Sequence, residues 1–580
     1  MIAVDAAPVS DPVGLEVFNQ RLLAITEEMG AHLVRSSFSP NIKERRDCSV
    51  ALFDREGRVL AQAAHIPIHL GSLVGGVEAV LRRFPPEEMT PGDAYVCNDA
   101  YLAGGTHLPD IAVITPVFWA DAVQFFVGCV GHHADVGGAV PGSISPDAAS
   151  IFEEGIRIPP VRLAEDGEVD ENVLELIAHN TREPEERMLD LRVQTAVNAR
   201  GVKNFHTLIE RMGLSEVQAA VDDLVVYTAT RLRRGIAAIP DGRYSGCAYM
   251  DDDGAQSGQV PIVVTATVTG DRLSFDCTGT GVQSGGAFNV MPSGVLATVA
   301  YAVKALLDPE LPPNRGLFES IELNVPLGTI LNPRFPAAVG ARTTTCQKLA
   351  GAIFAAFEPL LDPASAMAPS HDVLAAMVLS GDSPRREGAY VYLETVGGGI
   401  GATGAQDGAD GAHVHITNSL NMPIEAVELE YPLLVEAYGL IPDSGGAGEF
   451  RGGLGIAREV RVLEPDTTFS ARADGFEAMS PGARGGGHGR RCQVVHNHGQ
   501  GDERSMEPKQ RLMRIAPGDT IRMETPGGAG FGPPAARSIK AIAEDLADGK
   551  ATQEGARLAY GDGPVDAALD CLQGLTNDKG

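Results

Sequence analysis

The sequence predicts a multi-domain protein of the α+β class with a mixed sheet and helix architecture. Its 580 residues exceed the size at which one hydrophobic core keeps growing, so we expect about two to four domains. A long segment near the amino end has helical periodicity, and two segments after it have the pattern of β-hairpins. Helices and antiparallel strands in one region indicate a mixed domain.

The first predicted element is a helix that begins after Asp11. This residue is a suitable N-cap, and Pro12 suits the first helical position. Apolar residues then recur at steps of three and four, so one face of the helix must be buried. These residues are Leu15, Phe18, Leu22, Ile25, Met29 and Leu33.

Two β-hairpins are predicted next. Residues 46–62, RDCSVALFDREGRVLAQ, read as a strand, a turn at 55–57 and a returning strand. A second hairpin combines the β-forming runs 111–118 and 123–130, which are separated by WADA. With its turn centred near Ala120 and Asp121, antiparallel pairing would set Asp110 roughly opposite Gly131.

Histidines and aspartates gather at the open end of this second hairpin. His107 and Asp110 precede its first strand, and His132, His133 and Asp135 follow its second. They form two His-x-x-Asp elements flanked by glycines, and their donor atoms suit Zn, Mn, Fe or Co. The pattern favours a divalent-metal site. The alternative is a polar loop end that hydrogen-bonds its own backbone.

Further candidate ligands lie elsewhere in the chain. Asp47 and Asp99 could complete the coordination or accept hydrogen bonds that fix the imidazole tautomers. His413 and His415 alternate on a predicted strand within the glycine-rich segment 394–433. No carboxylates are arranged around them, so a second metal site there is less favoured.

Charge and cysteine content exclude several classes of protein. Lys and Arg number 46 against 76 Asp and Glu, a net charge of -30, which argues against duplex nucleic acid or an anionic membrane as partner. The eight cysteines include no CxxC pair and indicate reduced thiols. The amino end lacks a basic segment followed by an apolar one, and no run of about 18 apolar residues occurs. We therefore expect a cytoplasmic protein.

The rest of the chain is divided on weaker signals. Residues 276–290 could cradle an anion through backbone N–H groups or form a tight loop before a helix at 293–307. The tail from Arg537 predicts two short amphipathic helices joined at Gly549. The expected units are an N-terminal metal-site domain (1–240), a central α+β domain (241–380), a glycine-rich β domain (381–535) and a C-terminal helical tail (536–580).

Ordered blocks along the chain carry a resemblance to a known family. They are FNQRLLAITEEMG, SSFSPNIKERRDCSVALFD, CNDAYLAGGTHLPDIAVITPVF, VGHHADVGG, PGSISPDA, DSGGAGEFRGGLG and TPGGAGFG. The sequence resembles the hydantoinase B / 5-oxoprolinase family, which also includes the corresponding subunit of acetone and acetophenone carboxylases. The resemblance runs from about residue 12 to about residue 560 and implies a fold of the hydantoinase B type.

The resemblance implies a division of labour between two subunits. In that family an A-type subunit binds ATP and Mg and phosphorylates the substrate, and the B-type subunit carries one divalent metal, here Zn, Mn or Fe. The absence of a GxxxxGK[ST] motif agrees with ATP chemistry on a separate partner in a hetero-oligomer.

The motif match assigns roles to individual residues. It implies that His107, Asp110 and His132 are metal ligands and that Asp47 is a further acidic ligand or a base. His133 and Asp135 lie in the same block and are assigned, with Asp47, to catalysis, either by supporting the metal ligands or by proton transfer. Asn418 and Glu425 also fall in a matching block, TNSLNMPIEAVELEYP, and are candidates to approach the active site.

The function that the resemblance implies is ATP-dependent hydrolysis of a cyclic amide such as hydantoin, N-methylhydantoin or 5-oxoproline. Phosphorylation of the amide oxygen would supply a leaving group, and a metal-activated water would attack. One alternative is a subunit of an ATP-dependent ketone carboxylase. Another is a non-catalytic, metal-stabilised scaffold for the partner.

Overall fold

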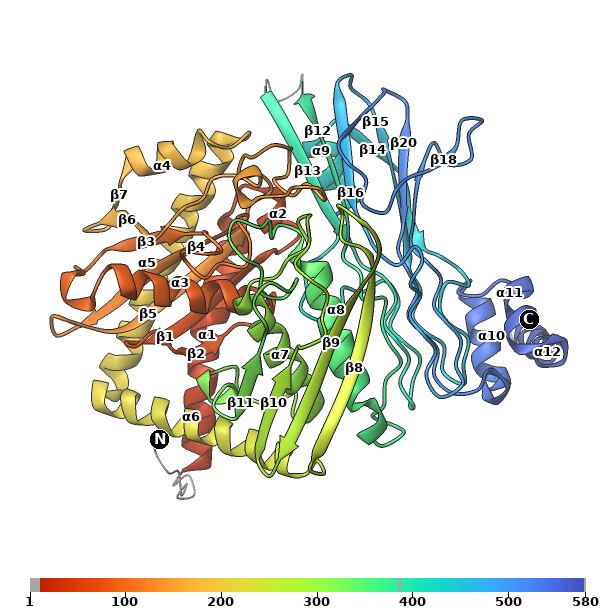
Figure 1. Ribbon diagram of the computed structural model, residues 1–580, viewed down its shortest axis with the longest axis horizontal. Coiled ribbons are helices and arrows are strands. Elements are labelled where there is room, and N and C mark those ends of the chain that lie inside the picture. The colour runs from red at the N-terminus through yellow and green to blue at the C-terminus, as the bar shows by residue number, and fades with distance from the viewer. Residues whose placement is uncertain (1–10, 384–387, 578–580) are drawn as a thin grey trace.

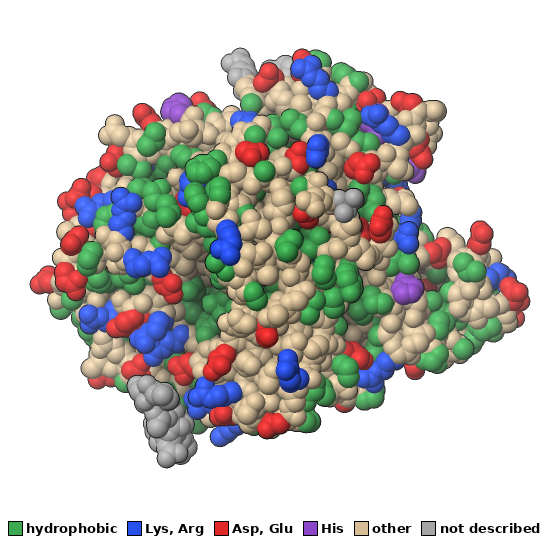
Figure 2. All heavy atoms as spheres, in the orientation of Figure 1, with side chains coloured by type: hydrophobic (Ala, Val, Ile, Leu, Met, Phe, Trp, Pro, Cys, Tyr) green, Lys and Arg blue, Asp and Glu red, His purple; other side chains and the backbone are tan. Residues whose placement is uncertain are grey.

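The computed structural model describes residues 11–383 and 388–577 of the chain. It confirms the α+β class, because helices and several antiparallel sheets alternate along the chain (Figure 1). In the described residues no helix is both long enough and apolar enough to span a bilayer. On the face drawn in Figure 2, acidic and basic side chains are interspersed.

The N-terminal part is built on a seven-stranded sheet with the strand order β2-β1-β5-β4-β3-β6-β7. Its strands are β1 (Cys48–Asp54), β2 (Val59–Gln62), β3 (Ala94–Cys97), β4 (Asp110–Trp119), β5 (Ala122–His132), β6 (Val161–Glu165) and β7 (Glu168–Val169). Its helices are α1 (Pro12–Ser36), α2 (Pro40–Lys43), α3 (His69–Arg83), α4 (Glu171–Ala178), α5 (Pro184–Met212) and α6 (Leu214–Ala237). Helices α1 and α5 cover one face and α3 covers the other, so β1 is buried along its whole length.

Helix α1 begins and packs as its sequence predicts. The Asp11 side chain accepts a hydrogen bond from the Gly14 N–H at 2.9 Å, and Pro12 is the first helical residue. All six apolar residues of the predicted face are buried. The helix is therefore fixed by one N-cap and one apolar stripe.

The second hairpin forms as predicted, but its register differs by one residue. Ala120 and Asp121 make the turn with φ of 49° and 64°. A β-bulge between Val117 and Phe118 then shifts the pairing, so Asp110 lies opposite His132 and not Gly131. The bulge adds a residue to one strand. The bulge thereby makes the Asp110 carboxylate and the His132 imidazole direct cross-strand neighbours.

The central part packs two helices on a four-stranded sheet with the order β11-β10-β9-β8. Its elements are β8 (Gly242–Asp252), β9 (Ser257–Thr269), β10 (Arg272–Asp276), α7 (Pro292–Leu307), β11 (Ile321–Asn324) and α8 (Arg342–Phe357). The loop at 276–290 is a tight one, because the Asn289 amide donates to the carbonyls of Ser284, Gly286 and Ala338. The interpretation as a strand-to-helix loop is therefore favoured over an anion cradle.

The third part contains a four-stranded sheet, β13-β12-β16-β19, and a five-stranded sheet, β14-β15-β20-β17-β18. Its elements are β12 (Ala375–Ser383), β13 (Gly388–Val396), α9 (Ile424–Glu430), β14 (Leu433–Leu440), β15 (Ile456–Val462), β16 (Thr467–Arg472), β17 (Gln493–His496), β18 (Arg504–Ser505), β19 (Met513–Ile515) and β20 (Thr520–Glu524). The predicted strand around His413 and His415 is wrong. His415 lies in a turn with φ of 57° and pairs with Asp372 at 2.6 Å.

Glycine-rich segments pack backbone against backbone beside these sheets. We call residues 397–411, 444–455 and 525–532 the glycine bundle. Gly399 donates its N–H to the Pro526 carbonyl at 3.0 Å, and the Gly528 N–H donates to the Gly453 carbonyl at 2.9 Å. A Cβ on Gly399 would lie 2.0 Å from the Gly453 oxygen. Only glycine permits this approach.

The tail forms three helices where two were predicted. Helices α10 (Ile539–Ala547) and α11 (Gln553–Tyr560) match the prediction, and α12 (Asp562–Asn577) follows Gly561, which has φ of 87°. They project from the third part (Figure 1). Arg537 anchors them through Asp407 at 2.8 Å and Asp545 at 2.6 Å. The domain limits at 240, 380 and 535 stay a prediction.

Candidate metal centre

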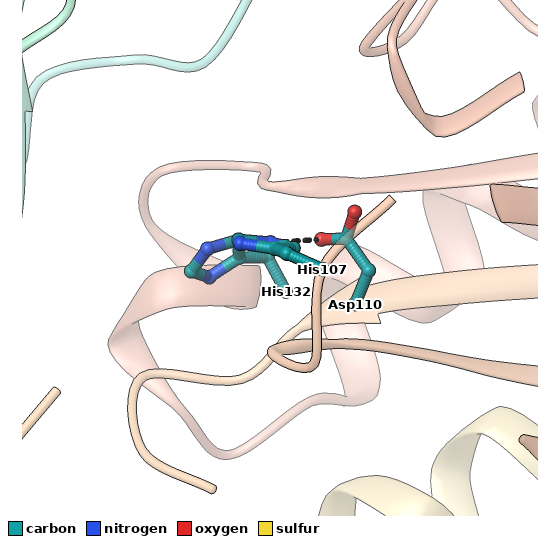
Figure 3. A group of neighbouring side chains, drawn as sticks. All are labelled: His107, Asp110 and His132. Atoms are coloured by element: carbon teal, nitrogen blue, oxygen red, sulfur yellow. Dashed lines mark hydrogen bonds and ion pairs between the residues drawn. The ribbon is translucent and has the colours of Figure 1, made fainter. Parts of the chain in front are cut away.

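His107, Asp110 and His132 meet at the open end of the second hairpin (Figure 3). Asp110 is the first residue of β4, His132 is the last residue of β5, and the loop before β4 brings His107 back beside them. All three are buried, and their potential ligand atoms lie within 4.8 Å of one another. The Nε2 atom of His107 is 2.9 Å from Oδ1 of Asp110.

This donor set fits a divalent metal. Two ligand atoms bound at about 2.1 Å and at a right angle lie about 3.0 Å apart, which matches the separation of His107 and Asp110. Nδ1 of His107 lies 3.0 Å from the Gly340 carbonyl oxygen and 3.1 Å from Nη1 of Arg342. When Nδ1 donates to that carbonyl, Nε2 keeps a lone pair directed at a carboxylate oxygen. A cation between the two atoms satisfies both.

The surroundings favour the protonation states that metal ligands need. Burial and the neighbouring Arg342 lower the pKa of His107 to about 4. Burial alone would raise the pKa of Asp110, but His107 and Arg342 outweigh it and hold that pKa well below its usual value. The histidine is therefore neutral and the aspartate ionised at neutral pH.

Neighbouring side chains hold the three candidate ligands in place. Nη2 of Arg342 donates to Oδ2 of Asp110 at 2.7 Å, and the Thr106 hydroxyl donates to the same oxygen at 2.9 Å. The Asn41 amide nitrogen lies 3.0 Å from Nδ1 of His132. These contacts leave Oδ1 of Asp110 facing His107, so little reorganisation is needed to receive a metal.

His107 and His132 border a cavity of about 50 Å³, which we call the central cavity. The N-terminal part contributes Asp47, His69, His107 and His132 to its wall, and the central part contributes residues 340–344. The third part contributes Leu374, Leu393, Thr395, Thr417, Ser419 and Arg472. The cavity therefore lies where the three parts of the chain meet.

Asp47 and His69 adjoin the candidate ligands. The backbone carbonyl of Asp47 accepts the His132 N–H at 2.9 Å, and burial raises the pKa of the Asp47 carboxyl. Nε2 of His69 lies 3.6 Å from Oδ1 of Asp47 and 3.4 Å from Oδ1 of Asp110. His69, which lines the cavity, thus lies between two carboxylates.

Comparison with known proteins places this centre in a family. The sequence profile of the hydantoinase B/oxoprolinase family matches residues 11–534. The chain belongs to that family. An uncharacterized protein of Methanocaldococcus jannaschii is 35% identical over 95% of the chain and 96% of its own length. Caprolactamase subunit beta of Pseudomonas jessenii is 31% identical over 95% of the chain and 96% of its own length.

Other members of the hydantoinase B/oxoprolinase family are much longer. 5-Oxoprolinase 1 of Arabidopsis thaliana is 32% identical over 91% of the chain, which spans only 42% of that protein. Among solved structures, ATP-dependent caprolactamase from Pseudomonas jessenii matches with a TM-score of 0.89 at 30% identity, covering 96% of this chain and 97% of the other. Nucleotide-free acetone carboxylase matches with a TM-score of 0.88 over 98% of this chain and 84% of the other. At 19% identity it shows the fold alone.

Two residues predicted for proton transfer in this family member lie outside the central cavity. Nδ1 of His133 accepts from Arg187, and its Nε2 lies 3.1 Å from the Gln194 side-chain oxygen. Both carboxylate oxygens of Asp135 are also engaged. They accept hydrogen bonds from the side chain and backbone of Arg182 and from two glycine N–H groups. These bonds indicate structural roles.

Replacing His133 by alanine tests that assignment. The change leaves Arg187, which is fully buried, without its histidine partner. We expect the free energy of unfolding to fall by about 2–3 kcal/mol while the metal content of the chain is unchanged. Thermal denaturation and elemental analysis measure the two effects. Loss of metal without loss of stability would instead show that His133 contributes to the metal centre.

The remaining candidates do not reach the central cavity. Asp99 pairs with Arg157 at 2.7 Å and caps the backbone of residues 101 and 102. Asn418 and Glu425 are exposed, although the neighbours of Asn418 at 417 and 419 line the cavity. His413 is half-buried, and burial followed by Arg45 lowers its pKa to about 3.

Sequence patterns missed His69, Arg45, Arg342 and Arg472. Arg45 is fully buried, donates to the Thr395 hydroxyl and lies 3.8 Å from Asp47. Arg342 opens α8, 232 residues after Asp110. None of the four belongs to a local motif. Only the unusual run RTTT at the start of a helix, with three β-branched residues, marks the position of Arg342.

Proposed function

We propose that this chain is the metal-binding subunit of an ATP-dependent hydrolase of cyclic amides. The observation that carries the proposal is the buried His107–Asp110–His132 group, with its held donor atoms, in a chain similar from end to end to caprolactamase subunit beta. Asp47 is proposed as a fourth ligand or base, because it lines the same cavity. Zn, Mn or Fe suits this mixture of nitrogen and oxygen donors.

A divalent metal bound there supplies a Lewis acid and lowers the pKa of water from 15.7 to about 7. The protein's own residues orient the reactants. Arg342 holds Asp110 ionised and in one rotamer, and Asn41 fixes the His132 ring. His69 lies within reach of Asp47 and Asp110. We assign proton transfer to Asp47 and His69, in place of His133 and Asp135.

We further propose that the ATP-dependent step belongs to an A-type partner subunit. The relative from Pseudomonas jessenii is named as a beta subunit, and the longer 5-oxoprolinase has more than half of its length outside the region that this chain matches. The sequence itself has no GxxxxGK[ST] motif. Cleavage of an unactivated amide is slow. Phosphorylation of the amide oxygen would remove the amide resonance, so that water adds to the carbon and the C–N bond breaks to open the ring. Hydrolysis of the resulting acyl phosphate would then release the carboxylate and phosphate.

Reconstitution with a purified A-type subunit tests the proposed function. We expect ring opening of caprolactam, hydantoin, N-methylhydantoin or 5-oxoproline that requires ATP and both subunits. Release of the ring-opened product, an amino acid or an N-carbamoyl amino acid, and of ADP is measured by chromatography. Bicarbonate-dependent consumption of acetone or acetophenone, with no ring opening, would favour the carboxylase alternative. Unchanged turnover in a complex carrying His107→Ala and Asp110→Ala would favour the scaffold.

A further inference from the structure

Arg472 is a buried cation that has no hydrogen-bond or ion-pair partner among the described residues. It ends β16, is 7% exposed and lines the central cavity. Within residues 11–383 and 388–577, no hydrogen bond or ion pair engages its side chain. Buried arginines in proteins are normally paired, because removing an unpaired charge from water is costly. A guanidinium held free at a cavity wall therefore indicates a ligand of opposite charge.

Neighbouring arginines increase the free-energy cost of burying the Arg472 charge. Burial, then Arg342 and Arg45, lower the pKa of Arg472 to about 9, so the side chain is still charged at neutral pH. Arg342 is already paired with Asp110 at 2.7 Å, and Arg45 with the Thr395 hydroxyl. Neither shares its acceptor with Arg472. Arg342 and Arg472 thus line the same small space, with Arg45 behind it, and among the described residues Arg472 alone of the three lacks an acceptor.

The charges around the central cavity do not balance. Arg342, Arg472 and Asp47 line the cavity. Arg45 lies 3.8 Å from Asp47 and Asp110 lies 2.7 Å from Arg342, so at and directly behind the wall three arginines stand against two carboxylates. Glu154 lies behind Gly340 and accepts its N–H, and burial raises the pKa of this glutamate to about 8. The three arginines, the two aspartates and an ionised Glu154 together carry no net charge. A divalent metal would bring the net charge of this group to about two positive charges. A ligand with two negative charges would neutralise it.

A helix terminus faces the same space. Helix α8 has 16 residues, and no side chain caps its first turn. Residues 341–344 of that turn line the central cavity with Arg472. The free N–H groups of a first helical turn and the positive end of the helix dipole together favour an anion. Arg472 and the first turn of α8 therefore supply two independent sets of hydrogen-bond donors at the central cavity.

We propose that Arg472 and the first turn of α8 form a subsite in the central cavity for the phosphoryl group of a phosphorylated substrate. This subsite rests on the proposed function, in which the partner transfers phosphate to the amide oxygen. A phosphoryl group carries up to two negative charges and three acceptor oxygens, which suit a guanidinium and a helix terminus. A carboxylate shares this chemistry but carries one charge, so the charge sum favours the phosphoryl group.

Binding of inorganic phosphate to the chelator-treated, metal-free chain tests the subsite without metal or activity. Calorimetry on the wild type is compared with Arg472→Met and with Arg514→Met, a control on the adjacent strand β19 whose side chain is 83% exposed. We expect phosphate binding to weaken at least about 10-fold in Arg472→Met and to be unchanged in the control. Equal binding by all three proteins would overturn the subsite. Binding of acetate or bicarbonate, but not phosphate, that depends on Arg472 would overturn the phosphoryl assignment.

Thermal stability gives a second, independent readout. Without phosphate, Arg472→Met should unfold at a higher temperature than the wild type, because the change removes an unpaired buried charge. A lower melting temperature would show that other groups of the protein already stabilise the charge of Arg472, and would contradict the proposal. His107→Ala/His132→Ala should lose metal and still bind phosphate. A failure of the metal centre is thereby separated from a failure of the subsite.

Discussion

Replacing His107 and His132 together by alanine is expected to remove the bound metal and abolish turnover of the reconstituted enzyme. Both imidazoles are buried, and their rings lie 4.9 Å apart beside the Asp110 carboxylate. Loss of a residue that merely supports a ligand commonly reduces metal affinity about 10–100-fold, so loss of two ligands should exceed that range. Elemental analysis should find about one divalent metal per wild-type chain and none in the variant.

A matched control separates this effect from general damage. His179 is exposed at the end of α4, and His179→Ala should keep the full metal content. If the wild type contained no metal even after supplementation with Zn, Mn and Fe, the two histidines would have a structural role instead. Restoring the metal to chelated wild type should restore activity, and restoring it to the double variant should not.

Replacing Gly399 by alanine is expected to destabilise the chain by at least about 3 kcal/mol, the upper part of the range for overpacked interiors. The new Cβ would lie 2.0 Å from the Gly453 carbonyl oxygen and 2.2 Å from the Gly528 nitrogen. Both atoms are backbone atoms of the glycine bundle, so no side-chain rotamer can relieve the clash. Chemical denaturation of the purified variant, or its absence from the soluble fraction, measures the effect.

Gly439 provides the control for this substitution. It lies on β14, and an added Cβ would have no heavy atom within 4 Å. Gly439→Ala should change the free energy of unfolding by less than about 1 kcal/mol. If both variants unfolded at the same denaturant concentration, the close backbone packing of the bundle would not be a source of stability.

Local patterns predicted the candidate ligands but not the residues that hold them. The two His-x-x-Asp elements lie within one hairpin, so their meeting follows from antiparallel pairing alone. The same pattern misplaced His133, because successive strand residues point to opposite faces. His132 therefore faces the central cavity while His133 faces α5. This alternation of side-chain direction follows from the sequence alone. It means that only one of two adjacent histidines on a strand can face a given metal centre.

The register and the distant partners could not be predicted in the same way. The bulge between Val117 and Phe118 directly follows Pro116, and a proline within a strand is typical of edges and bulges. The proline alone does not specify the shift in register, which moves Asp110 from Gly131 to His132. Arg342 and Arg472 reach the cavity from a helix start and a strand end in other parts of the chain. Their positions depend on how three cores pack together, which neither periodicity nor spacing encodes. The α+β class and the first helix were predicted because each depends on local residues only.

The meeting of three parts at one cavity has a consequence for the chain as it is synthesised. Gly340, whose carbonyl faces Nδ1 of His107, follows that histidine by 233 residues. At about 5–20 residues per second, the ribosome needs roughly 10–50 s to deliver it. During this interval the two histidines and Asp110 exist without Arg342 to hold the carboxylate. A metal held by these residues would therefore be selected from the ions that the nascent chain meets before the last strands close the cavity wall.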